Sequence, residues 1–129
     1  MFDGSMVTES ASSKFKHVYT TLGDFNGKPI AVAGYHTNEV EHFENDEWSS
    51  LQPIPDITRL HEFSTSTVSE ILYVFGGADG MDIKDVVWSY TGVWGRNTEL
   101  LLPRMGHRSI KIGATVFHVG GRSEDDHFM

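Results

Sequence analysis

The histidines are the residues of this 129-residue chain that could most readily do chemistry, and there are seven of them. An imidazole ring can bind a transition metal or carry a proton near neutral pH. Three of the rings, those of His17, His61 and His107, recur at spacings of 44 and 46 residues. That recurrence predicts a structural role, a hydrogen bond where a strand begins. His118 lies within an apolar strand, where we expect a hydrogen-bonded core residue.

Acidic side chains offer a second kind of chemistry. A tail cluster could hold a cation, but an acidic terminus is normally solvated; its members are Glu124, Asp125, Asp126 and His127. Two carboxylates can hydrolyse a glycoside when a definite distance separates them, and the candidate pairs are Asp79 with Asp82 and Asp24 with Glu39. Loop acids of this kind are ordinarily solvated surface. We expect no metal site here.

Familiar catalytic sequences are missing from the chain. It has no cysteine, which excludes thiolate nucleophiles, disulfides and cysteine-based zinc sites. It also lacks the Gly-x-Ser-x-Gly, Walker, His-Glu-x-x-His and dinucleotide-binding patterns. The sequence therefore predicts a protein that is not an enzyme and has no cofactor.

Charge and hydropathy narrow the class of partner. The net charge of −8 disfavours nucleic acid and anionic lipid, because both require clustered lysine and arginine. No stretch approaches the roughly 20 apolar residues of a membrane span, and the first residues do not resemble a secretory signal. We expect a cytoplasmic protein.

Strands that end in glycine must position these side chains. Each is a short apolar run, and they are Ile30–Gly34, Leu72–Gly77 and Val116–Gly121. Their first glycines, Gly34, Gly76 and Gly120, are 42 and 44 residues apart. Trp48 and Trp94 keep a similar interval of 46 residues. A period of about 40 to 50 residues is typical of four-stranded propeller blades. Trp88 has no place in this pattern.

Turn residues divide the chain into units. Asn26-Gly27 favours a type I′ hairpin turn, Asn45-Asp46 predicts another turn, and proline ends each of the first two units. We predict an all-β fold in the following segments: a disordered tail over 1–14, one blade over 15–57, a second over 58–103, half a blade over 104–122, and an acidic tail over 123–129. The glycine-ending strands are expected to be the innermost strands.

From residue 16 to residue 122 the chain resembles the kelch repeat. Phe75-Gly76-Gly77, Tyr90 and Trp94 carry the resemblance in the second unit. In the first unit Tyr35 stands where the second glycine belongs, and Phe43 replaces the tyrosine. The third unit stops after Val119-Gly120-Gly121. The resemblance implies an incomplete kelch-type β-propeller of four-stranded antiparallel blades, with fewer blades than the roughly four to eight of a closed ring.

The resemblance also implies a function and a site. Kelch propellers commonly bind partner proteins through the loops that join strands two to three and four to one, which lie on one face. Arginines on that face suit an acidic peptide. The candidate contact residues are Tyr35, His36, Arg59, His61, Asp79, Met81, Arg104 and Arg122. Exposed blade edges would also allow self-association. The alternatives are part of a kelch-like carbohydrate-active enzyme, or a truncated product without a separate function.

Overall fold

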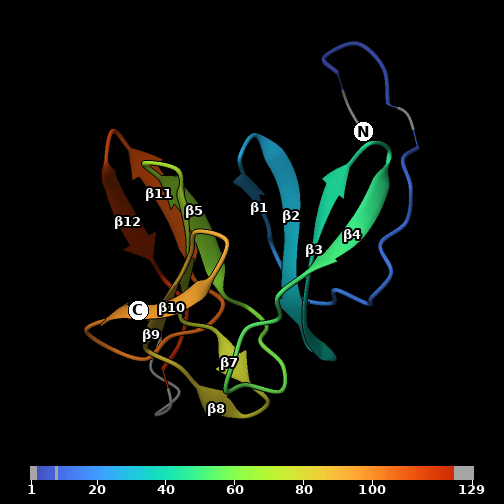
Figure 1. Cartoon of the computed structure of the whole chain (residues 1–129). Helices are drawn as coiled ribbons and strands as arrows, with labels where there is room; N and C mark the ends of the chain where they lie inside the picture. The colour runs from blue at the N-terminus through green and yellow to red at the C-terminus, as the bar shows by residue number, and fades with distance from the viewer. Residues whose placement is uncertain (1–2, 8, 124–129) are drawn as a thin grey trace.

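The computed structural model describes residues 3–7 and 9–123, and the regular structure within them is entirely β. Two four-stranded sheets and two hairpins make up the fold, and all strand pairs are antiparallel (Figure 1). The prediction of an all-β protein is confirmed. None of the described residues belongs to a helix that could cross a membrane.

The first sheet is a simple meander in the order β1-β2-β3-β4. Its strands are β1 (Leu22–Phe25), β2 (Lys28–Gly34), β3 (Thr37–Glu44) and β4 (Glu47–Leu51). Both predicted tight turns have the left-handed backbone that type I′ turns require: φ is 53° at Asn26 and 73° at Gly27, and 54° at Asn45 and 60° at Asp46.

The second sheet has the order β10-β9-β6-β5. Its strands are β5 (Ser64–Val68), β6 (Ile71–Phe75), β9 (Val86–Tyr90) and β10 (Trp94–Glu99). A small hairpin, β7 (Ala78–Asp79) with β8 (Asp82–Ile83), occupies the connection between β6 and β9. A C-terminal hairpin follows, formed by β11 (Arg108–Ile112) and β12 (Thr115–Val119).

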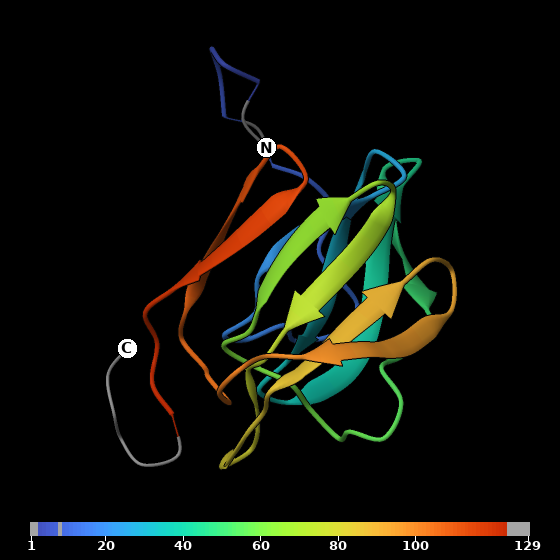
Figure 2. The same cartoon turned by 90° about the vertical axis from the view of Figure 1, so that its left-hand side faces the viewer.

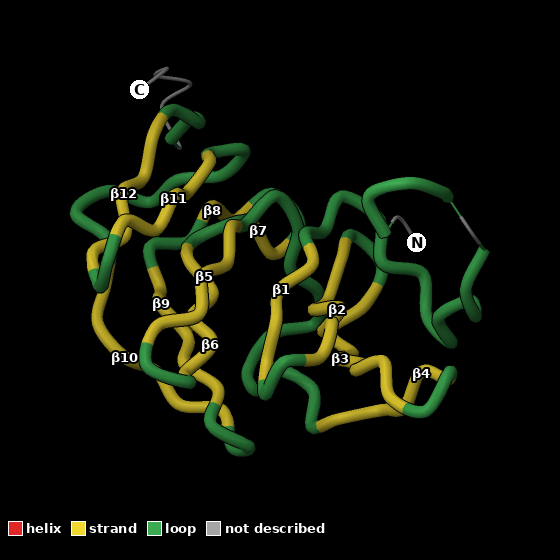
Figure 3. Tube along the Cα trace, turned by 90° about the horizontal axis from the view of Figure 1, so that it is seen from above, coloured by secondary structure: helices red, strands yellow, loops and turns green. Residues whose placement is uncertain are grey.

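The first strands of the three units, β1, β5 and β11, lie side by side (Figures 2 and 3). Hydroxyl groups join β5 to β1, because Thr65 Oγ1 donates to the Leu22 carbonyl at 3.3 Å and Thr67 Oγ1 to the Asp24 carbonyl at 2.6 Å. Lys111 Nζ in β11 donates to the Thr67 carbonyl at 2.9 Å. The expectation that the glycine-ending strands are innermost is therefore wrong, since β2, β6 and β12 are second strands. The described units do not close into a ring.

The main core lies between the two four-stranded sheets. Buried aliphatic residues of the first sheet, such as Ile30 and Val40, pack with Leu72, Val74 and Trp88 of the second sheet. Trp88, which the repeat pattern left unplaced, is a core residue of β9. Trp94 Nε1 donates to the Gln52 carbonyl at 2.7 Å and so ties the second sheet to the connection that follows β4.

The strand register corrects the alignment of the glycines. The second strands begin at Lys28, Ile71 and Thr115, and the sixth residue after each start is Gly34, Gly77 and Gly121. Gly34 is therefore the counterpart of the second glycine, with spacings of 43 and 44 residues. Ala33, and not Tyr35, marks the departure of the first unit from the glycine pair. Ala33 keeps the left-handed backbone of its counterparts, with φ of 47° against 61° at Gly76 and 76° at Gly120.

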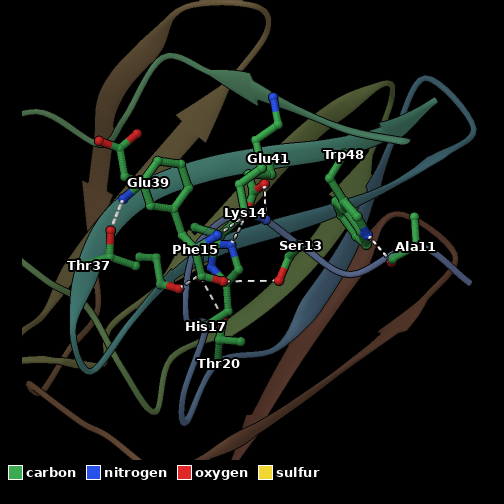
Figure 4. A network of polar contacts seen from close by, with 12 residues as sticks. Ala11, Ser13, Lys14, Phe15, His17, Thr20, Thr37, Glu39, Glu41 and Trp48 are labelled. Carbon is green, nitrogen blue, oxygen red and sulfur yellow. Dashed lines mark hydrogen bonds and ion pairs between the residues drawn. The ribbon is translucent and has the colours of Figure 1, made fainter. Parts of the chain in front are cut away.

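The N-terminal segment contacts the first sheet near the end of the expected tail over 1–14 (Figure 4). Trp48 Nε1 donates to the Ala11 carbonyl at 2.9 Å. The backbone N–H groups of Lys14 and Phe15 donate to the Glu41 carboxylate at 2.8 and 3.2 Å. The acidic cluster over 124–127 lies outside the described residues.

Candidate functional site

Four of the predicted contact residues meet at one end of the sheets. The Tyr35 ring, in the turn between β2 and β3, lies 5.0 Å from the rings of both His36 and His61. The Arg59 guanidinium carbon sits 4.9 Å from the centre of the Tyr35 ring, which is a cation–π geometry. We call Tyr35, His36, Arg59 and His61 the Tyr35 cluster. Two loops separated by a whole strand pair thus supply one surface.

The β7–β8 hairpin borders the Tyr35 cluster. His61 Nε2 donates to the Gly80 carbonyl at 3.1 Å. The Arg59 guanidinium packs against Gly80 so closely that a Cβ there would lie 2.7 Å from its Nη2 atom. Asp79 accepts hydrogen bonds from Thr58, from N at 3.3 Å and Oγ1 at 3.0 Å, and thereby holds the loop in place. The neighbouring Met81 is fully exposed.

Arg104 and Arg122 lie where the second sheet meets the C-terminal hairpin. The Arg104 carbonyl accepts from Gly77 N at 2.8 Å, and its Nη1 atom is 3.5 Å from the Gly120 carbonyl. Arg122 is exposed and pairs through its backbone with Met105. The structure therefore divides the predicted contact residues between two places.

Sequence reasoning missed a polar cavity of about 500 Å³ at the junction of the first strands. Hydroxyl-bearing residues of all three units line it: Thr20, Thr21, Ser64, Thr65 and Ser109. His107 also lines the cavity although it is almost fully buried. The first strands β5 and β11 and the residues just before β1 supply these side chains. Knowledge of which strands adjoin is the signal that could have identified them.

A chain of hydrogen bonds crosses this junction. His107 Nε2 is 2.8 Å from Ser64 Oγ, which is 2.5 Å from Ser109 Oγ, which is 2.6 Å from His118 Nδ1. Burial lowers the pKa of His107 to about 4, with smaller contributions from His118, Arg104 and Arg108. Burial, and then Arg104, lowers the pKa of His118. Both rings are therefore neutral at pH 7.

The Ser64–His107 pair does not form a nucleophile with an oriented base. A base of this kind needs a third group on its second nitrogen, and within the described residues His107 Nδ1 has no hydrogen-bond partner. A ring with a pKa of about 4 is also a weak base at neutral pH. Among the described residues, no three acidic or histidine side chains are grouped as metal ligands.

The three recurring histidines do not occupy the same position of the repeat. Equivalent positions of the repeat are occupied by Tyr19, Glu62 and Gly106. Each lies three residues before the residues that have matching positions in β1, β5 and β11, and each has a positive φ, of 53°, 55° and 68° in that order. His17 thus lies two residues before this position, His61 one before it and His107 one after it. Each ring still hydrogen-bonds, but to a different kind of partner.

His17 belongs to a buried ion pair (Figure 4). Its Nδ1 atom donates to the Ala33 carbonyl and its Nε2 atom to Glu41, both at 2.6 Å. Burial alone would raise the pKa of Glu41, but hydrogen bonds from His17 and from the N–H groups of Lys14 and Phe15 outweigh burial and lower that pKa. The fully buried carboxylate of β3 thereby holds the N-terminal segment.

Comparison with known proteins places the fold among solved structures. No protein-family model matches the chain, and no curated protein matches it. The fold and the junction define an all-β protein made of successive antiparallel sheets whose first strands adjoin. A solved structure with this arrangement is that of YjhT, with a TM-score of 0.75 and 11% sequence identity over 89% of this chain. The chain spans 40% of that structure, and identity this low shows the fold alone.

Proposed function

We propose that the chain is part of a kelch-type β-propeller and works as a protein-interaction module. The repeat supports the propeller, because equivalent residues recur at 43 and 44 residues and the first strands adjoin in sequence order. The likeness to YjhT over 89% of the chain supports a larger arrangement of such sheets. In this proposal each four-stranded sheet is a blade.

The Tyr35 cluster is the observation that carries the binding function. The exposed rings of Tyr35 and His36 and the half-buried Arg59 guanidinium, from separate loops, converge around the buried His61 ring. Stacking on Tyr35 holds the Arg59 guanidinium in one orientation, so less side-chain entropy is lost when a partner binds. A guanidinium presents a fork of donors that matches a carboxylate. We therefore propose an acidic peptide segment of another protein as the partner.

Binding to a library of immobilised peptides rich in aspartate and glutamate tests this function. Arg59→Ala should weaken retention of the peptides that the unmodified protein binds by about tenfold or more, since a charge-assisted hydrogen bond contributes about 1.5–3 kcal/mol. Tyr35→Ala should act in the same direction because it frees the guanidinium.

Arg96→Ala is the matched control. Arg96 also lies over an aromatic ring, that of Trp88 at 6.0 Å, but on the exposed strand β10. Its loss should leave binding unchanged. Equal retention of the Arg59→Ala and unmodified proteins would contradict the proposed surface.

A further inference from the structure

A ladder of backbone hydrogen bonds links the three units at their innermost position. Glu62 N–H donates to the Tyr19 carbonyl, and Gly106 N–H donates to the Glu62 carbonyl, both at 2.8 Å. Within the described part of the chain, the Gly106 carbonyl and the Tyr19 N–H make no hydrogen bond. The ladder therefore ends in a free acceptor on one side and a free donor on the other.

The acceptor end carries an uncovered apolar face. Ile110 pairs with Phe117 and Arg108 with Val119, so these side chains point to the same side of the C-terminal hairpin, and Ile112 shares that side. The exposed fractions are 57% for Ile110, 62% for Ile112, 49% for Phe117 and 67% for Val119. The hairpin's opposite side meets the second sheet through Ser109 and Lys111.

The repeat shows what normally covers this face. Phe117 and Val119 occupy the positions of Ile30 and Val32 in the first sheet, two and four residues after the start of the second strand. Ile30 and Val32 are fully buried because the next sheet packs on them. The hairpin thus presents the surface of a blade whose following blade is absent from the described residues.

The donor end is apolar as well. Leu22 in β1 is 61% exposed, and Phe15, Val18 and Tyr19 of the segment that leads into β1 are also exposed. In the contact between the two sheets, a Cβ at Gly23 would touch both Leu72 and Thr65. Ile110 is the counterpart of Gly23, and Leu22 is the counterpart of Thr65. If a following unit began like the first one and packed on the hairpin in the register of Gly23 against Thr65, its Leu22 would lie against Ile110.

We propose that two copies of this chain associate head to tail. The hairpin face of one copy packs on the β1 side of the next, with the Gly106 carbonyl accepting from a second copy's Tyr19 N–H. The interface continues the register of the internal contacts, and it buries apolar residues on both sides. It is heterologous, so each copy uses different surfaces at its two ends. The proposal rests on the sheet arrangement and not on the acidic-peptide function.

Light scattering after size-exclusion chromatography tests the association, with blocking variants at each end. The unmodified chain should show masses above 14.4 kDa that rise with concentration. Ile110→Lys blocks only the hairpin end and Leu22→Lys blocks only the β1 end, so each variant alone should run as a monomer. An equimolar mixture should form pairs of twice the single-chain mass, because each variant keeps the end that the other has lost.

Val93→Lys is the control for an added exposed lysine. Val93 is exposed in the turn between β9 and β10, away from both ends, and this variant should associate like the unmodified chain. Circular dichroism should show the same strand content for all variants. A single-chain mass at every concentration would overturn the proposal. A mixture of the two blocking variants that stays monomeric would overturn it as well.

Discussion

At the scale of single residues, the second glycine of each unit is fixed by close backbone contact. At Gly77, φ is 88°, and a Cβ would lie 2.8 Å from the His61 carbonyl oxygen. Gly121 is tighter still, with the Met105 carbonyl at 2.5 Å. The positive φ and the lack of room for a Cβ atom therefore both require glycine. These glycines let the second strand pass close to the connection that enters the first strand.

Gly77→Ala should destabilise the protein by about 3 kcal/mol or more, because a left-handed alanine costs about 1–2 kcal/mol and the overlap adds a further penalty. Gly113→Ala is the comparison: its φ is 63°, but a Cβ there meets no atom within 4 Å. That variant should lose only the backbone penalty of about 1–2 kcal/mol. Urea unfolding measures both changes, and similar losses would contradict the role assigned to close contact.

The buried His107 should make the protein less stable in mild acid. Between pH 6.5 and about 4 the unfolded chain binds a proton on this ring and the folded chain does not. Lowering the pH therefore favours unfolding, by about 1–2 kcal/mol between pH 6.5 and 5. His107→Asn should flatten this dependence, whereas exposed His36→Asn should not. An unchanged slope in His107→Asn, measured by urea unfolding at both pH values, would contradict this assignment.

At the scale of elements, the N-terminal segment depends on the carboxylate in β3. Glu41→Ala should cost about 3–5 kcal/mol, because it leaves buried His17 and two backbone N–H groups without their acceptor. It should also speed trypsin cleavage after Lys14. Glu44→Ala removes a half-exposed pair with Lys28 and should cost at most about 1 kcal/mol. Equal cleavage rates in the two variants would argue against this attachment.

The sequence predicted strands best where turn residues bound them on both sides. The turn residues Asn45-Asp46, Thr91-Gly92 and Gly113-Ala114 predict neighbouring strands over 47–51, 86–90 and 115–119. These are the bounds of β4, β9 and β12. The glycine register was misread because Gly34 is followed by Tyr35, so the missing partner was sought on the wrong side. Only strand pairing shows that Ala33 adopts the positive φ of a first glycine. Trp88 was unplaced because its counterpart in the first sheet, Glu41, has the opposite polarity.

At the scale of the whole molecule, the predicted surface and the missed cavity differ in a physical way. The Tyr35 cluster is built from the two kinds of loop that the kelch resemblance assigned to one face, so the resemblance could indicate it. Arg104 and Arg122 were predicted to share this face, and they lie by the C-terminal hairpin, away from the four residues of the cluster. The junction cavity depends on which strands are innermost and on side-chain contacts between units, such as Ser64 with Ser109. The spacing of the repeat alone predicts neither which strands are innermost nor these side-chain contacts.

The hairpin β7–β8 also bears on how the chain tolerates insertions. In the first sheet the connection between the second and third strands is the two-residue turn Tyr35-His36. In the second sheet the corresponding connection comprises residues 76–85. The second and third strands of the second sheet still pair as those of the first sheet do, so the longer connection does not interrupt the hydrogen bonds between these strands. A foreign loop grafted between Gly34 and Thr37 would replace Tyr35 and His36 and would be displayed at the same end of the sheets, beside Arg59, so this turn is a suitable position for exchanging one binding specificity for another.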